Sequence, residues 1–415
     1  MIVMTAAVFL VALCLRPAIT AVGPLLPQIS VDEHLGEAAQ GLLGALPLLA
    51  FALVSPQVHR LARRLGTERA VLVALLVLAA GGVVRSYAGD GGLWVGTVVI
   101  GCAIAVGNVL VPVIVKRDYA ANVSRATGYY TACITLAAAT ASALAVPIAG
   151  LASWRLALSV WSLLALLIAA IWLPRTRPRT AAARAAATGP AGAGAGQAGA
   201  AEAGAAGADS AAAEAGAAAL AGVSVWRQPR AWLITAFMGL QSTTFYVLVT
   251  WLPTVEIDGG VSERTAGLHL FLFQGMGIIG GLTIPFLLRH PRHRSLGAVV
   301  ASLPVLLAII GLLTAPALAV LWAAIAGLGQ GAALVTALTL ISLGGRDHAE
   351  TTRLSGMAQS LGYLLAASGP FLAGLLAEQT GNWTASLFLV AAFALLQITA
   401  GAAAAHTRVP RSPQL

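Results

Sequence analysis

The stretch HRLARRLGTERAVLVALLVLAAGGVVRS, residues 59–86, decides the architecture of this chain. Residues 59–69 carry four Arg, whereas residues 70–86 are almost purely aliphatic up to Arg85. A helix needs about 20 apolar residues to cross roughly 30 Å of hydrocarbon. A cationic gap followed by such an apolar run is typical of a loop that leads into a membrane-spanning helix.

The same alternation recurs along the chain and predicts an all-α integral membrane protein with twelve transmembrane helices. Hydrophobic residues make up 59% and charged residues 9% of the 415 residues, which leaves too little polar surface to cover a soluble globule. We expect spans at 3–27, 39–58, 70–86, 92–115, 126–148, 154–173, 230–253, 265–288, 296–314, 317–343, 354–377 and 383–405.

The positive charges are distributed asymmetrically between the gaps. All of the 24 Lys and Arg except Arg16, Arg85, Arg155 and Arg264 lie in alternate gaps, and acidic residues gather in the others. Cationic loops stay in the cytoplasm, so both termini are expected there, in a multi-pass protein of the cell membrane. These short flanking loops also explain the net charge of +9 through orientation and contact with anionic lipid, rather than through nucleic-acid binding.

The apolar segments divide into two related groups of six. We expect an N-terminal bundle over 1–174, a flexible cytoplasmic Ala/Gly-rich linker over 175–228, a C-terminal bundle over 229–406 and a cytoplasmic tail over 407–415. The fourth span exits with Arg117-Asp118 and the tenth with Arg346-Asp347. Two similar halves in parallel are typical of a transporter whose substrate binds near the midplane.

Several motifs resemble those of the major facilitator superfamily, in the branch of cyanate and 2-nitroimidazole transporters. They are LRPAIT at 15–20, GPLLP at 23–27, GNVLVP at 107–112, VKRD at 115–118, FY at 245–246 and WLP at 251–253. The resemblance implies two six-helix bundles that transport a small molecule by alternating access, usually as a monomer. One departure is Arg63-Arg64-Leu65-Gly66, where the family usually places Asp-Arg before Gly, so a gating ion pair that uses this Asp is in doubt.

Arg16 is the leading candidate for substrate binding. It lies about 13 residues into its span, roughly 20 Å along the helix at 1.5 Å per residue, close to the membrane centre. A guanidinium is costly there, and none of the expected spans contains Asp or Glu. Pro17 removes a backbone donor beside it, so the helix is expected to kink. Either an anionic substrate pairs with Arg16, or backbone and amide groups hold it as a structural strut.

Other polar residues in the spans are candidates for contact with the substrate. Amides and phenols can ligate a small polar solute, although each can equally link two helices. These candidates are Asn108, Gln241, Tyr246, Gln274, Gln330, Gln359 and Tyr363. His269 is a candidate for proton coupling, unless it lies in an external vestibule.

Charges after the fourth and tenth spans form a candidate cytoplasmic gate. The residues are Arg117, Asp118, Arg125, Arg346, Asp347 and Arg353. The alternative is that they are solvated loop charges, because exposed ion pairs contribute little.

These features favour a secondary active transporter of a small anionic or polar organic solute, such as a cyanate-like anion, a carboxylate or a nitroimidazole. The alternative within transport is a multidrug-type efflux antiporter for neutral compounds. An enzyme would need a nucleophile with a base, or paired metal ligands, and a sensor would need a folded cytoplasmic domain. We therefore expect no catalytic residue, no metal and no cofactor. The expected partners are a small-molecule substrate and membrane lipid, with protons if His269 couples them to transport.

Overall fold

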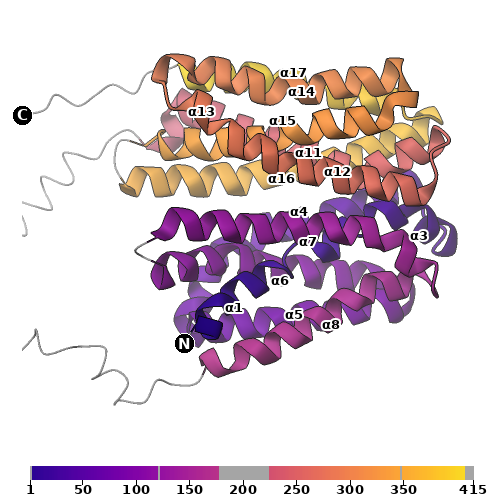
Figure 1. Cartoon of the computed structure of the whole chain (residues 1–415), viewed down its shortest axis with the longest axis horizontal. Helices are drawn as coiled ribbons and strands as arrows, with labels where there is room; N and C mark the ends of the chain where they lie inside the picture. Colours follow the sequence, from indigo (N-terminus) through magenta and orange to yellow (C-terminus); the bar gives the residue numbers. More distant parts are fainter. Residues whose placement is uncertain (1, 120–121, 177–223, 346–347, 407–415) are drawn as a thin grey trace, which may run out of the picture.

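The structure is a computed structural model, and it describes residues 2–119, 122–176, 224–345 and 348–406. These residues form a helical bundle with its helices roughly parallel to one long axis (Figure 1). Twelve helical segments are long and apolar enough to cross a membrane, as the sequence predicts. Of the expected linker at 175–228, residues 177–223 lie outside the described residues, as do Arg346, Asp347 and the tail at 407–415.

The first span is not one helix but a chain of four short elements. They are α1 (Ile2–Ala12), α2 (Pro17–Thr20), the 3-10 turn η1 (Gly23–Leu25) and α3 (Leu26–Asp32). The span therefore runs on to Asp32, beyond the expected end at residue 27. Three proline residues at the starts of these elements, Pro17, Pro24 and Pro27, explain the segmentation, since proline cannot donate an intrahelical hydrogen bond.

The remaining spans are long helices joined by short turns. In the first half they are α4 (Glu37–Leu65), α5 (Thr67–Tyr87), α6 (Gly89–Asp118), α7 (Val123–Ala149) and α8 (Trp154–Trp172). In the second half they are α11 (Pro229–Asp258), α12 (Glu263–Thr283) with the short α13 (Pro285–Leu288), α14 (Arg294–Thr314), α15 (Ala319–Ser342), α16 (His348–Thr380) and α17 (Thr384–His406).

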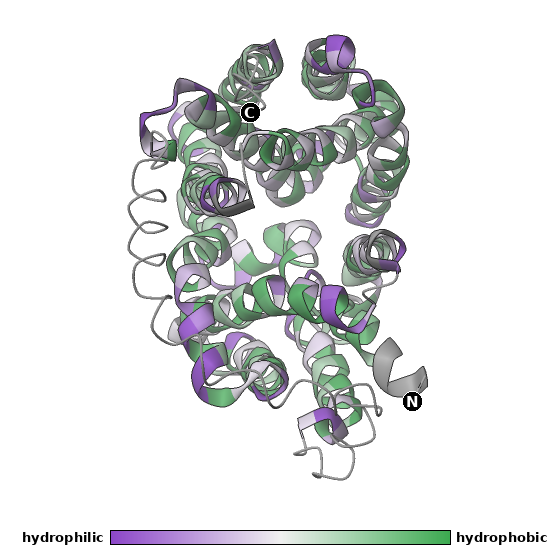
Figure 2. Ribbon diagram, turned by 90° about the vertical axis from the view of Figure 1, so that its left-hand side faces the viewer, coloured by the Kyte–Doolittle hydropathy of each residue, from purple (hydrophilic) through white to green (hydrophobic). Residues whose placement is uncertain are grey.

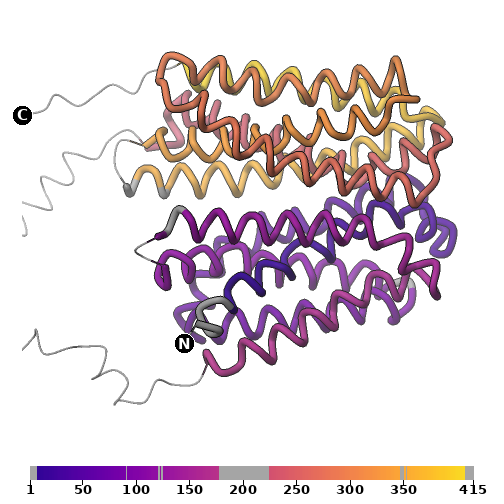
Figure 3. The backbone as a smooth tube through the Cα atoms, viewed as in Figure 1, coloured from indigo at the N-terminus to yellow at the C-terminus, as the bar shows by residue number. Residues whose placement is uncertain are grey.

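The two halves of the chain lie side by side. In Figure 3 the first half fills the lower part of the bundle and the second half the upper part. Helices α4 and α16 pack against each other, and so do α7 and α12. The nearly pure aliphatic helices α5, α8, α14 and α17 pack mainly within their own half. The end view in Figure 2 shows green, hydrophobic helices with purple, hydrophilic residues concentrated near helix ends.

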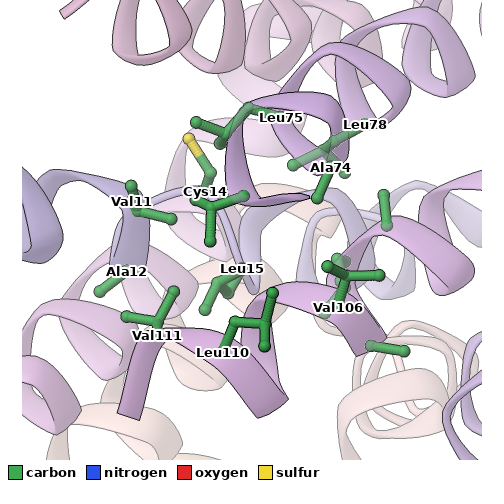
Figure 4. Packing of buried hydrophobic residues seen from close by; sticks show 14 of the residues in the cluster. Val11, Ala12, Cys14, Leu15, Ala74, Leu75, Leu78, Val106, Leu110 and Val111 are labelled. Carbon is green, nitrogen blue, oxygen red and sulfur yellow. The ribbon is translucent and has the colours of Figure 1, made fainter. Parts of the chain in front are cut away.

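The broken first span is held by a tightly packed apolar cluster. Val11, Cys14 and Leu15 are buried and point towards residues of α5 and α6 (Figure 4). Among those partners are Leu75 of α5 and Leu110 of α6, which are also buried. This packing fixes the backbone on either side of the break, so the position of Arg16 is set by its buried neighbours.

The halves meet closely at one end of the bundle. We call the end where α1 begins and α17 ends the terminal face, and the other end the distal face (Figure 1). At the distal face, a Cβ on Gly41 of α4 would overlap the backbone of Pro370, and one on Gly374 of α16 would overlap that of Glu37. At the terminal face, a Cβ on Gly128 or on Gly356 would meet nothing within 4 Å.

Candidate functional site

The backbone is interrupted next to Arg16. The N–H groups of Leu13, Cys14 and Leu15 bond to carbonyl oxygens three residues back, and Pro17 then begins α2. Pro17 has no N–H, and its ring would clash with the carbonyl of Leu13 in a continuous helix. Arg16 therefore stands between two helical segments, as the sequence predicts for a kink beside the charge.

The Arg16 guanidinium lies against aromatic rings of the other half. Its Cζ is 5.4 Å from the ring centre of Phe245 and 5.7 Å from that of Tyr246, both on α11. The side chain is half-buried, and within the described part of the chain no carboxylate or hydrogen-bond acceptor is paired with it. Arg16 is thus a cation at the seam between the halves, held by aromatic faces.

Further aromatic side chains pack around these rings. Phe245 stacks on Phe273 of α12 with ring centres 5.9 Å apart, and Tyr363 of α16 meets Phe51 of α4 edge-on at 5.6 Å. The phenols of Tyr130, Tyr246 and Tyr363 interact electrostatically with the Arg16 guanidinium. We call Arg16 with Tyr130, Phe245, Tyr246 and Tyr363 the Arg16 site.

Two tyrosines of the Arg16 site, Tyr246 and Tyr130, need separate comment. The hydroxyl of Tyr246 is buried and has no hydrogen-bond partner among the described residues. A buried phenol without a partner is uncommon, which marks this hydroxyl as a candidate for contact with a ligand. Tyr130 of α7 was missed by sequence reasoning; its signal was the pair Tyr129-Tyr130 close to the start of a span.

Gln274 connects the two halves. Its amide donates to the carbonyl oxygen of Ala138 at 3.1 Å and to the hydroxyl of Ser142 at 2.8 Å, both on α7. Ser142 also lies 3.2 Å from the carbonyl oxygen of Thr20, one turn after Arg16. Gln274 therefore supports the segment that carries Arg16 and does not contact its guanidinium.

Gln241 and Gln330 are engaged within the second half. Both are buried. With the Gln330 amide oriented to satisfy its neighbours, its nitrogen donates to the carbonyl oxygen of Gln241 and its oxygen accepts from the N–H of Phe245, each at 3.2 Å. The hydroxyl of Thr244 links this group to Gln397 at 3.0 Å. The arrangement ties α15 and α17 to α11 next to the aromatic face that meets Arg16.

Asn108 and Gln359 lie in less buried positions. Asn108 of α6 is half-buried and makes no side-chain hydrogen bond to another described residue. Its neighbour Gly107 packs against the side chain of Leu15, so Asn108 lies near the break. Gln359 is exposed on α16, and its amide donates to the hydroxyl of Ser355 at 3.0 Å.

A second arginine, Arg85, lies near the end of the expected span 70–86 and is buried in α5. Its Nη1 donates to the carbonyl oxygen of Ala18 at 2.6 Å, while Nε and Nη2 have no partner among the described residues. Ala18 belongs to α2, the short helix that begins after Arg16. Arg85 therefore anchors the segment on which Arg16 is mounted.

Helix α11 extends beyond the expected span 230–253 and carries a carboxylate in its added turn. Helix α11 runs through Pro253 to Asp258, so Glu256 lies within it instead of in a loop. The Glu256 side chain is fully buried, and its Oε2 is 2.9 Å from Nδ1 of His269 on α12. His269, the candidate for proton coupling, is thus paired with an acid that lies beyond the expected span 230–253.

Charges near the terminal face pair within the first half. Arg117 bonds to Glu68 at 2.6 Å and to Asp118 at 2.9 Å, and Asp118 also pairs with Arg175. Glu68 was missed; it follows the Arg63-Arg64-Leu65-Gly66 turn in which the family's usual Asp is replaced. Of the other candidate gate residues, Arg125 and Arg353 are exposed, and Arg346 and Asp347 lie outside the described residues.

Similarity to known proteins decides the family. Residues 8–367 match the Major Facilitator Superfamily. The chain belongs to this family. Over 409 residues it is 37% identical to the 2-nitroimidazole transporter of Escherichia coli (strain K12), covering 98% of this chain and 96% of that protein. It is 25% identical over 377 residues to the cyanate transport protein CynX of the same organism, covering 90% of each. The solved structure of a D-xylose-proton symporter shares the fold, with a TM-score of 0.73 at 15% identity over 99% of this chain and 98% of the other.

Two sequence predictions are therefore confirmed. The protein has the all-α, twelve-span major facilitator fold, and it is related to the cyanate and 2-nitroimidazole transporters. It is a multi-pass membrane transporter of the Major Facilitator Superfamily, and its relatives are transporters rather than enzymes.

Proposed function

We propose that this protein is a secondary active transporter of a small anionic or polar organic solute, which it binds at the Arg16 site. The observation that carries the proposal is a half-buried guanidinium at the seam between the halves without an anionic partner among the described residues. A charge in this position is costly unless an anion accompanies it. A planar guanidinium binds carboxylate-like groups through two parallel hydrogen bonds, and such charge-assisted bonds are among the stronger ones.

The aromatic side chains near Arg16 narrow the class of solute that the site can bind. The half-buried Phe245 presents a flat apolar face, backed by the buried Phe273, while Tyr246 offers a hydroxyl without a partner. A compact planar solute with a negative or strongly polar end fits both features. The names of two relatives, a 2-nitroimidazole transporter and a cyanate transport protein, agree with this class. Asn108, Gln274 and Tyr363 are proposed as supporting residues, and Gln241, Gln330 and Gln359 as further candidates for contact with the solute.

Transport is proposed to follow alternating access in a monomer in the cell membrane. We assign residues 1–174 and 229–406 to the two moving bundles, 175–228 to the linker and 407–415 to the tail. The terminal face is assigned to the cytoplasm because its loops carry most of the Arg residues. On that assignment the close packing of Gly41 and Gly374 seals the external side. Opening of that side requires new contacts near the terminal face, for which Arg117, Asp118, Arg125, Arg346, Asp347 and Arg353 are the candidates.

Efflux of neutral compounds is the second candidate function. The half-buried ring of Phe245 supports it, because an aromatic face can stack on a neutral heteroaromatic ring without help from a charge. In that case Arg16 serves as a structural strut, with its charge against the faces of Phe245 and Tyr246.

Uptake into proteoliposomes tests the proposal and separates the two candidates. With cyanate as the solute, Arg16→Lys is expected to weaken uptake and Arg16→Gln to abolish nearly all of it, because Lys retains the charge but not the planar fork. Arg264→Gln is the matched control, since Arg264 is exposed near the distal face. Full uptake by Arg16→Gln would remove Arg16 from the site, and transport of 2-nitroimidazole alone, unaffected by Arg16→Gln, would favour the neutral-compound carrier.

A further inference from the structure

A buried acid and a histidine form a pair at the distal end of the second half. Glu256 of α11 and His269 of α12 are joined by one contact of 2.9 Å between Oε2 and Nδ1. The other carboxyl oxygen, Oε1, is buried without a hydrogen-bond partner among the described residues. The Glu256 side chain is fully buried, whereas that of His269 retains 13% exposure. The carboxyl group of the pair is therefore shielded from solvent, whereas the imidazole is partly accessible to it.

The number of protons on this pair decides its net charge. Without an added proton, Nδ1–H of a neutral His269 donates to an ionised Glu256, and the pair carries one negative charge. With one added proton the pair is neutral, whether the proton is on the carboxyl or on the imidazole. A buried net charge with an unsatisfied oxygen is costly, and a neutral pair avoids that cost. The closed environment around Glu256 therefore favours the proton-loaded pair.

Among the described residues, no other charged side chain pairs with Glu256 or His269 to offset this cost. Helix α11 carries Asp258, which is exposed, and α12 carries Glu263 and Arg264 in its first turn, where Glu263 accepts a hydrogen bond from Gln28 at 2.6 Å. Of the other helices packed against α11, α15 has no charged residue, α17 has only His406 at the terminal face, and α4 and α16 carry Glu37 and Glu378 at this end. Within the described residues, His269 is the titratable group that contacts Glu256.

The pair is bracketed by contacts between the halves. On α11, Thr250 lies against Gly44 of α4, and Val249 lies against Gly23 of the first span. On α12, Gly267 lies against the carbonyl oxygen of Ser142 on α7. Separation of the halves at the distal face removes these contacts on both helices that carry the pair. If this separation lets water reach Glu256, the cost of its negative charge falls.

We propose that Glu256 and His269 form a proton-binding site that is occupied when the distal face is closed and releases its proton to water when that face opens. The proposal rests on the alternating access proposed above, and it assigns the proton to Glu256 where the sequence offered His269 alone. By linkage, a proton that binds more tightly to the closed state stabilises that state. Acidification on the distal side therefore closes this face.

Distances between spin labels across the distal face test the proposal. Leu151 of the first half is 80% exposed and Gln379 of the second half is exposed, so both accept labels as Leu151→Cys and Gln379→Cys once Cys14, Cys102 and Cys133 are replaced by alanine. In nanodiscs, the ratio of closed to open molecules is expected to rise by up to about 100-fold between about pH 8 and about pH 6, because one proton binds.

Three variants distinguish proton binding from packing. Glu256→Gln mimics the protonated acid, so its distances are expected to stay short at both pH values. His269→Asn removes the group that pairs with the carboxylate and is expected to hold Glu256 protonated and the distances short as well. Asp258→Asn, on an exposed carboxylate of the same helix, is expected to keep the wild-type response.

Two results would overturn the proposal: wild-type distances that do not change with pH, or a pH response that survives in both Glu256→Gln and His269→Asn. If Glu256→Gln does not fold, His269→Asn alone distinguishes proton binding from packing. Short distances at both pH values would support proton binding, and a wild-type pH response would contradict it. Arg16→Gln is expected to keep the pH response. If the pH response is missing but anions still bind at Arg16, only the proton site is refuted. If the pH response is present but anions do not bind at Arg16, only the substrate site is refuted.

Discussion

Gly41→Ala is expected to shift the protein away from the state in which the distal face is closed. A Cβ at this position overlaps the carbonyl oxygen of Pro370 and lies 3.0 Å from the Cα of Phe371. Non-bonded carbon atoms prefer about 3.5–4.0 Å, and these neighbours are backbone atoms that cannot rotate away. Overpacking of this kind costs about 1–3 kcal/mol. Since only the closed state has the clash, its population relative to the open state is expected to fall about 5- to 150-fold.

The spin-label pair across the distal face measures this shift at a fixed pH. Gly128→Ala is the matched control, because it adds the same methyl group to a helix near the terminal face where nothing lies within 4 Å. Gly374→Ala, which overlaps the carbonyl oxygen of Glu37, is expected to act like Gly41→Ala. Short distances in Gly41→Ala equal to those of the wild type would refute the view that this seam seals the distal face.

Two further substitutions test the supports of the Arg16 site. Gln274→Leu removes both hydrogen bonds to Ala138 and Ser142 and is expected to lower the free energy of unfolding by about 1–3 kcal/mol. The loss should appear as a lower melting temperature in detergent. An unchanged melting temperature would show that the bonds contribute nothing to stability. Arg85→Met removes the hydrogen bond to Ala18 together with two unpartnered nitrogens, so stability is expected to change by less than about 1.5 kcal/mol while anion affinity at Arg16 falls. Wild-type affinity in Arg85→Met would show that the anchor does not position Arg16.

Most of the fold was predictable because a membrane leaves few alternatives. Long apolar runs separated by cationic or acidic gaps predict helices directly, and the repeated Arg-Asp exits predicted the relation between the halves. The ends of the spans were harder to predict. Pro253 suggested a helix end, yet α11 continues to Asp258 because neighbouring helices bury it on several sides. That extension places Glu256 inside the span.

The Arg16 site was predictable only in part. Arg16 and Tyr246 are visible as polar groups in apolar runs, and the break at Pro17 follows from proline chemistry. Tyr130 and Phe273 are aromatic residues among many, and their place near Arg16 depends on how α7 and α12 cross the seam. The roles of Gln274, which links helices, and Gln359, which is exposed, depend likewise on tertiary packing.

Thermal unfolding of the purified protein with and without small anions tests the central claim most directly. Cyanate at 100 times its dissociation constant is expected to stabilise the wild type by about 2.7 kcal/mol and to leave Arg16→Gln unchanged. Arg264→Gln is expected to respond like the wild type. Equal stabilisation of the wild type and Arg16→Gln by anions, or stabilisation of both by neutral nitroimidazoles alone, would contradict an anion site centred on Arg16.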